Sequence, residues 1–207
     1  MRQNRRIIAI LIMWTIIIAT LAETDRRKIN KQRAVILEEK LINLDINKMV
    51  ADRMQREKEE QDSLFEVAVQ IIKKYEGWHT AKDYPYVGYG HRLLPTDNFD
   101  SNISKEFAEQ VLREDLKKKC AEFSEFGKDS LLLGTLAYNI GEYNIKGGYG
   151  RRTSELFTKL KNGDRDIYES YISFRKWNGK VVPSIERRRI EEFTNLFIGS
   201  DYEKTES

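Results

Sequence analysis

One glutamate at the end of a predicted helix is placed where acid catalysis would need it. Glu76 directly precedes Gly77, a residue type common just past a helix C-terminus, and Trp78 follows. The negative end of a helix dipole and burial against an aromatic ring both favour the protonated form of a carboxyl group. Glycoside hydrolysis needs such a group to protonate the leaving oxygen. Taken alone, the pattern fits a solvated last-turn glutamate better than a catalytic one.

The elements that would position Glu76 can be predicted on both sides of it. A capping box at Ser63–Glu66 predicts a helix that begins there and ends close to Glu76. Tyrosines and glycines crowd residues 84–91, which predicts a small β-ribbon. Later helices are predicted from three serine caps, from a nearly all-apolar central stretch and from a final amphipathic segment: Ser104, Ser130 with 131–138, Ser154, and 185–197. Residues 61–200 are therefore predicted to form one mostly helical α+β domain.

Cysteine and histidine are too few for a metal site of the usual kind. Cys120 is the one cysteine, and the chain has two histidines. Cys120 follows Leu116 by four residues, which predicts a packed position on the apolar face of a helix. We expect neither a metal nor a cofactor.

The first 22 residues have the pattern of an export signal. Arg2, Arg5 and Arg6 precede the uncharged run 7–22, in which only two threonines interrupt the hydrophobic residues. A helix of this length would span about 24 Å, less than the roughly 30 Å of a hydrocarbon core, so both a cleaved signal peptide and a membrane-bound signal-anchor remain open. A buried helix of the fold is less compatible with a run that has no polar face.

Residues 23–60 contain neither glycine nor proline and are rich in Lys, Arg and Glu, which predicts a charged helical stem. Its apolar residues do not keep a clean heptad, so a solvated spacer is favoured over a coiled coil. Self-association, or a partner in a cell-envelope machine, would use this segment. Residues 201–207 are predicted to be a flexible tail.

Charge and composition exclude several classes of protein. The three arginines of residues 1–22 account for the whole formal net charge of +3, so the rest of the chain has a net charge of zero. That argues against a nucleic-acid partner. With 40% hydrophobic residues and only three prolines, the chain is not low-complexity, collagen-like or largely disordered.

Five blocks, in order, resemble the phage-type lysozymes, glycoside hydrolase family 24, over about residues 63–198. The blocks are Tyr75-Glu76-Gly77 with Gly88-Tyr89-Gly90-His91; Ile103–Glu106 with Asp115; Ala137–Gly141; Ser154–Leu156 with 160–164; and Trp177 with 182–189 and Glu192. The resemblance implies a two-lobed lysozyme-like domain. It also implies a muramidase that cuts the β-1,4 bond between N-acetylmuramic acid and N-acetylglucosamine in the peptidoglycan glycan strand.

The resemblance assigns Glu76 as the general acid but leaves the second catalytic group open, because the segment between Glu76 and His91 is shorter than in the family. Asp83 is the carboxylate closest to the family's aspartate position, and it is equally compatible with a turn residue before Pro85. Tyr86 occupies the family's threonine position and could orient water. His79 could replace the missing base or simply pack at the lobe boundary.

The remaining matched residues point to substrate binding. His91 matches a family histidine with a structural character, Tyr138 and Asn139 match a cleft-lining position, and Ser154 belongs to a matched block. Packing and capping are the alternatives for Tyr138 and Asn139. For residues 187–189, a solvated face is favoured over contact with muropeptide carboxylates.

Taken together, the sequence predicts an exported muramidase, periplasmic or anchored in the inner membrane through residues 7–22 if that segment is not cleaved. Two alternatives remain open. One is a lytic transglycosylase that uses Glu76 alone. The other is a catalytically inactive peptidoglycan-binding module.

Overall fold

The computed structural model describes residues 2–198, although the side chains of residues 2–12 and 29 are outside the description. The predicted flexible tail, 201–207, also lies outside the described residues. The chain divides into two compact units, Met1–Glu59 and Glu60–Ser207. The elements, in order, are α1 Arg2–Glu76, η1 Ala81–Asp83, β1 Tyr86–Val87, β2 His91–Arg92, α2 Lys105–Ala121, η2 Ser124–Asp129, α3 Ser130–Ile140, α4 Tyr143–Lys146, α5 Glu155–Lys161, α6 Tyr168–Ile172, η3 Ser173–Arg175, β3 Lys176–Trp177, β4 Lys180–Val181 and α7 Pro183–Leu196.

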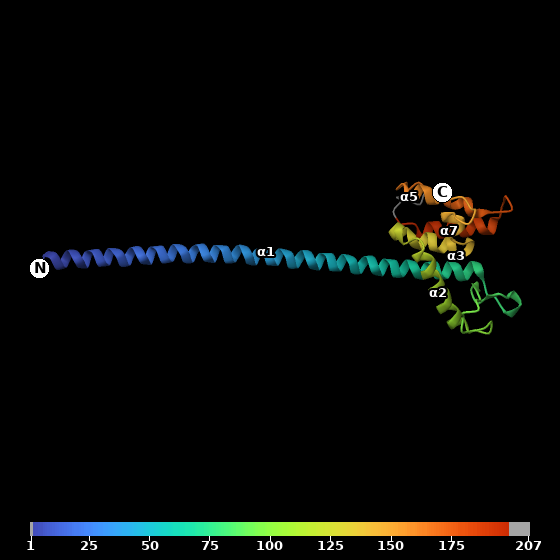
Figure 1. The fold of residues 1–207 in the computed structure, drawn as a ribbon, viewed down its shortest axis with the longest axis horizontal. Coiled ribbons are helices and arrows are strands. Elements are labelled where there is room, and N and C mark those ends of the chain that lie inside the picture. The colour runs from blue at the N-terminus through green and yellow to red at the C-terminus, as the bar shows by residue number, and fades with distance from the viewer. Residues whose placement is uncertain (1, 199–207) are drawn as a thin grey trace, which may run out of the picture. The chain divides into compact units, whose positions relative to one another are not determined.

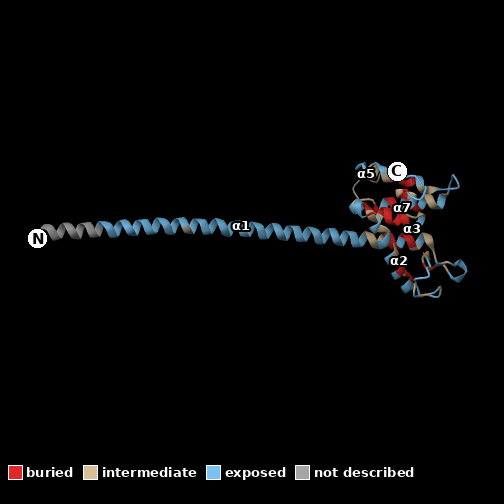
Figure 2. Cartoon of the chain, in the orientation of Figure 1, coloured by how far each residue is buried: buried red, intermediate tan, exposed pale blue. Residues whose placement is uncertain are grey.

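Helix α1 is continuous, so the predicted helix start at Ser63 is wrong (Figure 1). No glycine or proline interrupts the sequence before Gly77, and the Lys, Arg and Glu residues of the stem are good helix formers. The backbone groups of Ser63 are therefore satisfied within the helix, and no cap is needed there. Glu66, the other member of the predicted capping box, pairs instead with Arg113 of α2. Every described side chain between residues 13 and 59 is exposed (Figure 2).

The apolar run 7–22 is helical as part of α1, and the side chains of its first six residues lie outside the described part. Within the part of the chain that the structure describes, no helix combines the length and the apolarity needed to cross a membrane.

The core of the second unit is built around α3. Five of its residues are fully buried, namely Leu132, Leu133, Thr135, Leu136 and Ala137. Helix α3 packs against α2 and α7, as predicted for the central apolar segment (Figure 1). A Cβ at Gly134 would lie 2.6 Å from the Cys120 sulfur and 2.8 Å from its backbone nitrogen. Glycine at this position therefore allows α2 and α3 to approach closely, and Cys120 packs against the core as predicted.

The ribbon and two of the three serine caps agree with the sequence predictions. Ser130 is instead the first residue of α3, whose N-cap residue is Asp129 and makes no side-chain capping bond. The hydroxyls of Ser104 and Ser154 accept hydrogen bonds at the starts of α2 and α5. In the ribbon, β1 and β2 are antiparallel, with Tyr86 opposite Arg92 and Val87 opposite His91. A second hairpin, β3–β4, was not predicted, although Asn178-Gly179 at its turn is a typical hairpin signal.

His91 ties the ribbon to its surroundings. Its Nδ1 lies 2.5 Å from Asp115 Oδ2 on α2, and its Nε2 lies 3.1 Å from Asp97 Oδ2. Burial lowers the pKa of His91, but the hydrogen bonds to Asp115 and Asp97 outweigh it, so the pKa is raised above its ordinary value of 6.5. The charged imidazolium therefore stabilises the folded state.

The stability of the second unit should fall as the pH rises. A raised folded-state pKa means that the contribution of His91 is complete below pH 6.5 and is lost as the pH rises through the folded-state pKa. We expect a loss of about 1.5–3 kcal/mol in unfolding free energy, the usual size for hydrogen bonds to charged groups. Chemical denaturation of the wild type and of His91→Gln at pH 5.5 to 8.5 measures it. The difference in stability between the two proteins should shrink with pH. A constant difference would contradict the assignment.

Candidate functional site

Glu76 is the last residue of α1, and one of its oxygens is held by two side chains from different helices. Oε1 accepts a hydrogen bond from Arg188 Nη1 of α7 at 2.7 Å and from Asn139 Nδ2 of α3 at 3.3 Å. The Glu76 side chain is 19% exposed, so the carboxylate is reachable from solvent. The site is thus assembled where three helices meet.

The other oxygen, Oε2, has no hydrogen-bond partner among the described residues. The backbone of Gly90 in the ribbon lies beside it, since a Cβ at Gly90 would stand 3.7 Å from Oε2. The φ angle of Gly90 is +94°, a left-handed conformation that side chains disfavour. Glycine at this position therefore brings the ribbon close to Glu76 while leaving Oε2 open.

The prediction of a solvated face for residues 187–189 is wrong for Arg188 and Arg189, which are buried, whereas Arg187 is exposed as predicted. Arg188 is 4% exposed and Arg189 is fully buried. Both bind Glu192, itself fully buried: Arg188 Nε donates to Oε1 at 2.8 Å and Arg189 Nη1 to Oε2 at 2.6 Å. Tyr171 also donates its hydroxyl to Glu192 Oε2, at 2.8 Å. Buried charges persist only when they are paired in this way.

The buried cluster continues to the site through Asn139. Arg189 Nη2 donates to Asn139 Oδ1 at 2.5 Å, which turns the amide nitrogen of Asn139 toward Glu76. Sequence reasoning missed these roles, yet a signal was present. Arg189, Phe193 and Leu196 are spaced i, i+4 and i+7, so Arg189 stands on the buried stripe of α7.

Arg188 is a charged partner of Glu76 that the sequence analysis did not predict. Its Nη1 lies 2.7 Å from Glu76 Oε1, so the two side chains form an ion pair. Burial lowers the pKa of Arg188, and Glu192 and Glu76 raise it more, so Arg188 remains a permanent cation beside Glu76.

Asp83 is engaged within its own turn. Its Oδ2 accepts hydrogen bonds from the backbone nitrogen of Thr80 at 2.6 Å and from the Thr80 hydroxyl at 3.0 Å. Together Thr80 and Asp83 form the capping box of η1. The backbone and hydroxyl donors of Thr80 lower the pKa of Asp83, so its carboxylate is ionised at neutral pH.

His79 and Tyr86 lie next to each other in the ribbon. Their ring centroids are 6.2 Å apart, and the backbone of His79 exchanges two hydrogen bonds with Gly88. The His79 Nδ1 atom is buried and makes no hydrogen bond within the described chain. Tyr86 is 45% exposed. No contact joins either described side chain to Glu76.

Of the other predicted site residues, only Asn139 makes a hydrogen bond to Glu76 within the described chain. Tyr138 fixes the ribbon, because its hydroxyl donates to the Tyr89 carbonyl at 2.9 Å. Asn139 contacts Glu76 directly, whereas His91 pairs with Asp97 and Asp115 and makes no hydrogen bond to Glu76 within the described chain. Ser154 caps α5, with its hydroxyl accepting from Phe157 N at 3.1 Å, and no described contact connects it to Glu76.

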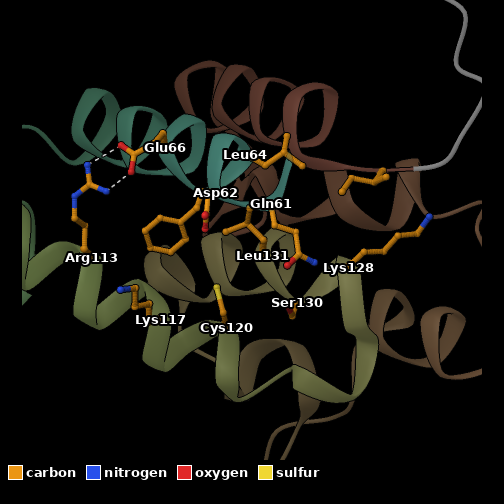
Figure 3. Close-up of a pocket in the computed structure, with 12 residues that line it drawn as sticks. Gln61, Asp62, Leu64, Glu66, Arg113, Lys117, Cys120, Lys128, Ser130 and Leu131 are labelled. Carbon is orange, nitrogen blue, oxygen red and sulfur yellow. Dashed lines mark hydrogen bonds and ion pairs between the residues drawn. The ribbon is translucent and has the colours of Figure 1, made fainter. Parts of the chain in front are cut away.

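A separate pocket of about 420 Å³ lies between α1, α2 and α3 and contains none of the predicted site residues. Figure 3 shows Arg113 reaching Glu66 across its rim and the Cys120 sulfur at its wall. Burial raises the pKa of Cys120 to about 12, so its thiol is not a nucleophile at neutral pH. Cys120 is therefore not a candidate catalytic residue.

The arrangement around Glu76 suits proton transfer to an oxygen of a bound ligand. One carboxyl oxygen is fixed by Arg188 and Asn139, and the other faces the ribbon without a partner among the described residues. Comparison of the sequence with curated proteins gives no match. The family model described as phage lysozyme matches residues 73–192, a span that contains Glu76, His91, Asn139 and the Arg188–Glu192 cluster. The chain therefore belongs to the phage lysozyme family, whose members are lysozyme-type glycoside hydrolases that act on peptidoglycan.

Proposed function

We propose that the protein is a muramidase that cleaves the β-1,4 bond between N-acetylmuramic acid and N-acetylglucosamine, with Glu76 as general acid. The observation that carries the proposal is the asymmetric environment of its carboxyl group. Oε1 is held by Arg188 and Asn139, and Oε2 is left free beside Gly90. A proton on Oε2 can reach a glycosidic oxygen bound between the ribbon and α3.

The proposed step begins with proton transfer from Glu76. Its Oε2 donates a proton to the glycosidic oxygen, the bond from that oxygen to the anomeric carbon breaks, and positive charge develops on the sugar. Water adds to the anomeric carbon and releases a proton to a base. Once Glu76 has donated its proton, its carboxylate keeps Arg188 Nη1 as an ion-pair partner at 2.7 Å.

Asp83 is the proposed second carboxylate, which either stabilises the positive charge on the sugar or activates water. His79 and Tyr86 together are the alternative water-binding pair. The hydrogen bonds from Thr80 keep Asp83 ionised, which suits the first role. The same bonds occupy Oδ2, which favours the rival function of a lytic transglycosylase that needs only Glu76. An inactive peptidoglycan-binding module is the remaining alternative.

The proposal extends to location and attachment. Residues 1–22 would direct the chain out of the cytoplasm, as a cleaved signal or as an anchor, and the supporting observation is their uncharged run after three arginines. Residues 23–60 would hold the catalytic unit toward the cell wall, with self-association or an envelope partner along their exposed apolar side chains, among them Val35, Ile42, Ile46 and Met49.

Replacing Glu76 by glutamine should remove activity and leave the fold intact. The side-chain amide of Glu76→Gln can still accept a hydrogen bond from Arg188, but it carries no acidic proton. Release of soluble fragments from purified peptidoglycan should therefore fall about 1,000-fold, within the range for loss of a general acid. The matched control is Glu66→Gln. Glu66 lies on the same helix as Glu76, and its carboxylate also pairs with an arginine, Arg113 of α2, so this variant should retain activity. Equal activity of Glu76→Gln and wild type would refute the proposal.

Asp83→Asn separates the hydrolase from the transglycosylase. If Asp83 is the second carboxylate, the variant should lose about 100-fold or more in rate, and the wild type should release reducing muramic ends. Thr80→Ala loosens the same cap but keeps the carboxylate, so it isolates the structural effect. Mass spectrometry of the products reads out the chemistry. Full activity of Asp83→Asn together with 1,6-anhydro ends would favour the transglycosylase instead.

A further inference from the structure

The charged stem of α1 exposes a run of apolar side chains to solvent (Figure 2). Val35, Ile42, Ile46 and Met49 are each between 48% and 70% exposed. Apolar side chains gathered on one exposed surface mark an interaction site, whereas a solvated spacer has no use for them. The stem is therefore a docking surface as well as a spacer.

These four side chains lie on one face of the helix. Their spacing from Val35 is i+7, i+11 and i+14, which a helix of 3.6 residues per turn brings into one stripe. Glu39 falls inside this stripe, one turn after Val35, and Arg53 falls at its end, one turn after Met49. These two charges interrupt the heptad pattern, and they have opposite signs.

The signs of the two charges favour antiparallel pairing with a second copy of the stem. In a parallel pair each residue of the stripe faces its own copy, so Glu39 would face Glu39 and Arg53 would face Arg53. An antiparallel pair with Ile42 opposite Ile46 of the second copy places Val35 opposite Arg53. Glu39 then lies one turn along the interface from Arg53 of the second copy, a distance that their long side chains can span.

Residues beside the stripe support the same orientation. Ile36 and Val50 are exposed on one edge of it, and antiparallel pairing brings Ile36 of one copy against Val50 of the other. Residues 26–33 contain five bases and no acid, while residues 57–60 contain three acids and one base. Antiparallel pairing lays the basic segment of each copy along the acidic segment of the other, whereas parallel pairing would set like charges together.

The other edge of the stripe is acidic, with Glu38, Asp45 and Asp52. In the antiparallel pair the acids of this edge lie near those of the second copy. They remain at the solvated rim of the interface, where interactions between charges are worth little. The charges within the stripe and the apolar edge therefore decide the orientation.

We infer that residues 23–60 of two copies pair as an antiparallel coiled coil, with its twofold axis beside Leu44. This pairing rests on the self-association proposed for the stem, to which it gives one partner and one orientation, and it is independent of the muramidase activity. The N-termini of such a pair point in opposite directions. Two copies anchored in one membrane through residues 7–22 could not form it, so the pairing also favours a cleaved signal.

Sedimentation equilibrium of the full chain in a mild detergent measures the association. Combining Ile42→Lys with Ile46→Lys places four charges at the centre of the interface, so the dimer dissociation constant should rise by about 100-fold or more. The matched control combines Leu37→Lys with Leu44→Lys, which adds the same charges on the opposite face of the stem and should leave the dimer intact. A monomeric wild type, or equal weakening by both pairs of substitutions, would overturn the inference.

Disulfide formation reports the orientation. In a Cys120→Ser background, an oxidised mixture of Val35→Cys and Arg53→Cys chains should give mainly the mixed dimer, because these positions face each other. The two copies of Val35 would be about 27 Å apart along the antiparallel pair, too far for a disulfide. Efficient cross-linking of Val35→Cys to itself would indicate a parallel pair and overturn the inference. Peptidoglycan cleavage by the Ile42→Lys, Ile46→Lys chain should match the wild type, so failure of the dimer and failure of the muramidase proposal are distinguishable.

Discussion

The catalytic unit depends on one buried carboxylate, that of Glu192, which is held between two arginines and a tyrosine. Glu192 and Arg189 are fully buried, and a charge in that position is tolerated only with all of its partners present. Removing one partner of such a group typically costs about 3–5 kcal/mol. The cluster therefore fixes the orientation of both arginines on α7, and the arginines in turn determine what Glu76 and Asn139 can contact.

That constraint explains how distant parts of the chain produce one site. Arg188 links the end of α1 to α7, and Asn139 links the same carboxylate to the end of α3. The ribbon is placed by separate contacts, with Tyr138 holding Tyr89 and Asp115 holding His91. Gly90 then lies beside the free oxygen of Glu76. The site is rigid where the carboxyl is held and open where a substrate oxygen would approach.

The sequence predicts much of this fold because local signals dominate it. Ser104 and Ser154 cap helices as predicted, and the apolar stretch after Ser130 is the central helix. The helix start predicted at Ser63 is wrong because the sequence pattern of a capping box is also compatible with a helix interior, and no glycine or proline precedes Ser63 to end the helix. The residues around Glu76 were harder to predict. An arginine triplet has the composition of a solvated face. The i, i+4 spacing of Arg189 and Phe193 is the signal of burial, because the pairs with Glu192 at i+3 and i+4 within α7 would form equally well on an exposed helix face.

The rate of peptidoglycan cleavage tests the central claim, that Arg188 holds the Glu76 carboxyl group in the position the proposed reaction needs. Arg188 Nη1 donates to Glu76 Oε1 at 2.7 Å, and loss of a hydrogen bond to a charged group typically costs about 1.5–3 kcal/mol, so Arg188→Gln should lower the cleavage rate about tenfold or more. Circular dichroism would verify that the variant is folded, with Glu192 still bound by Arg189 and Tyr171. A folded Arg188→Gln variant that cleaves peptidoglycan at the wild-type rate would contradict the account.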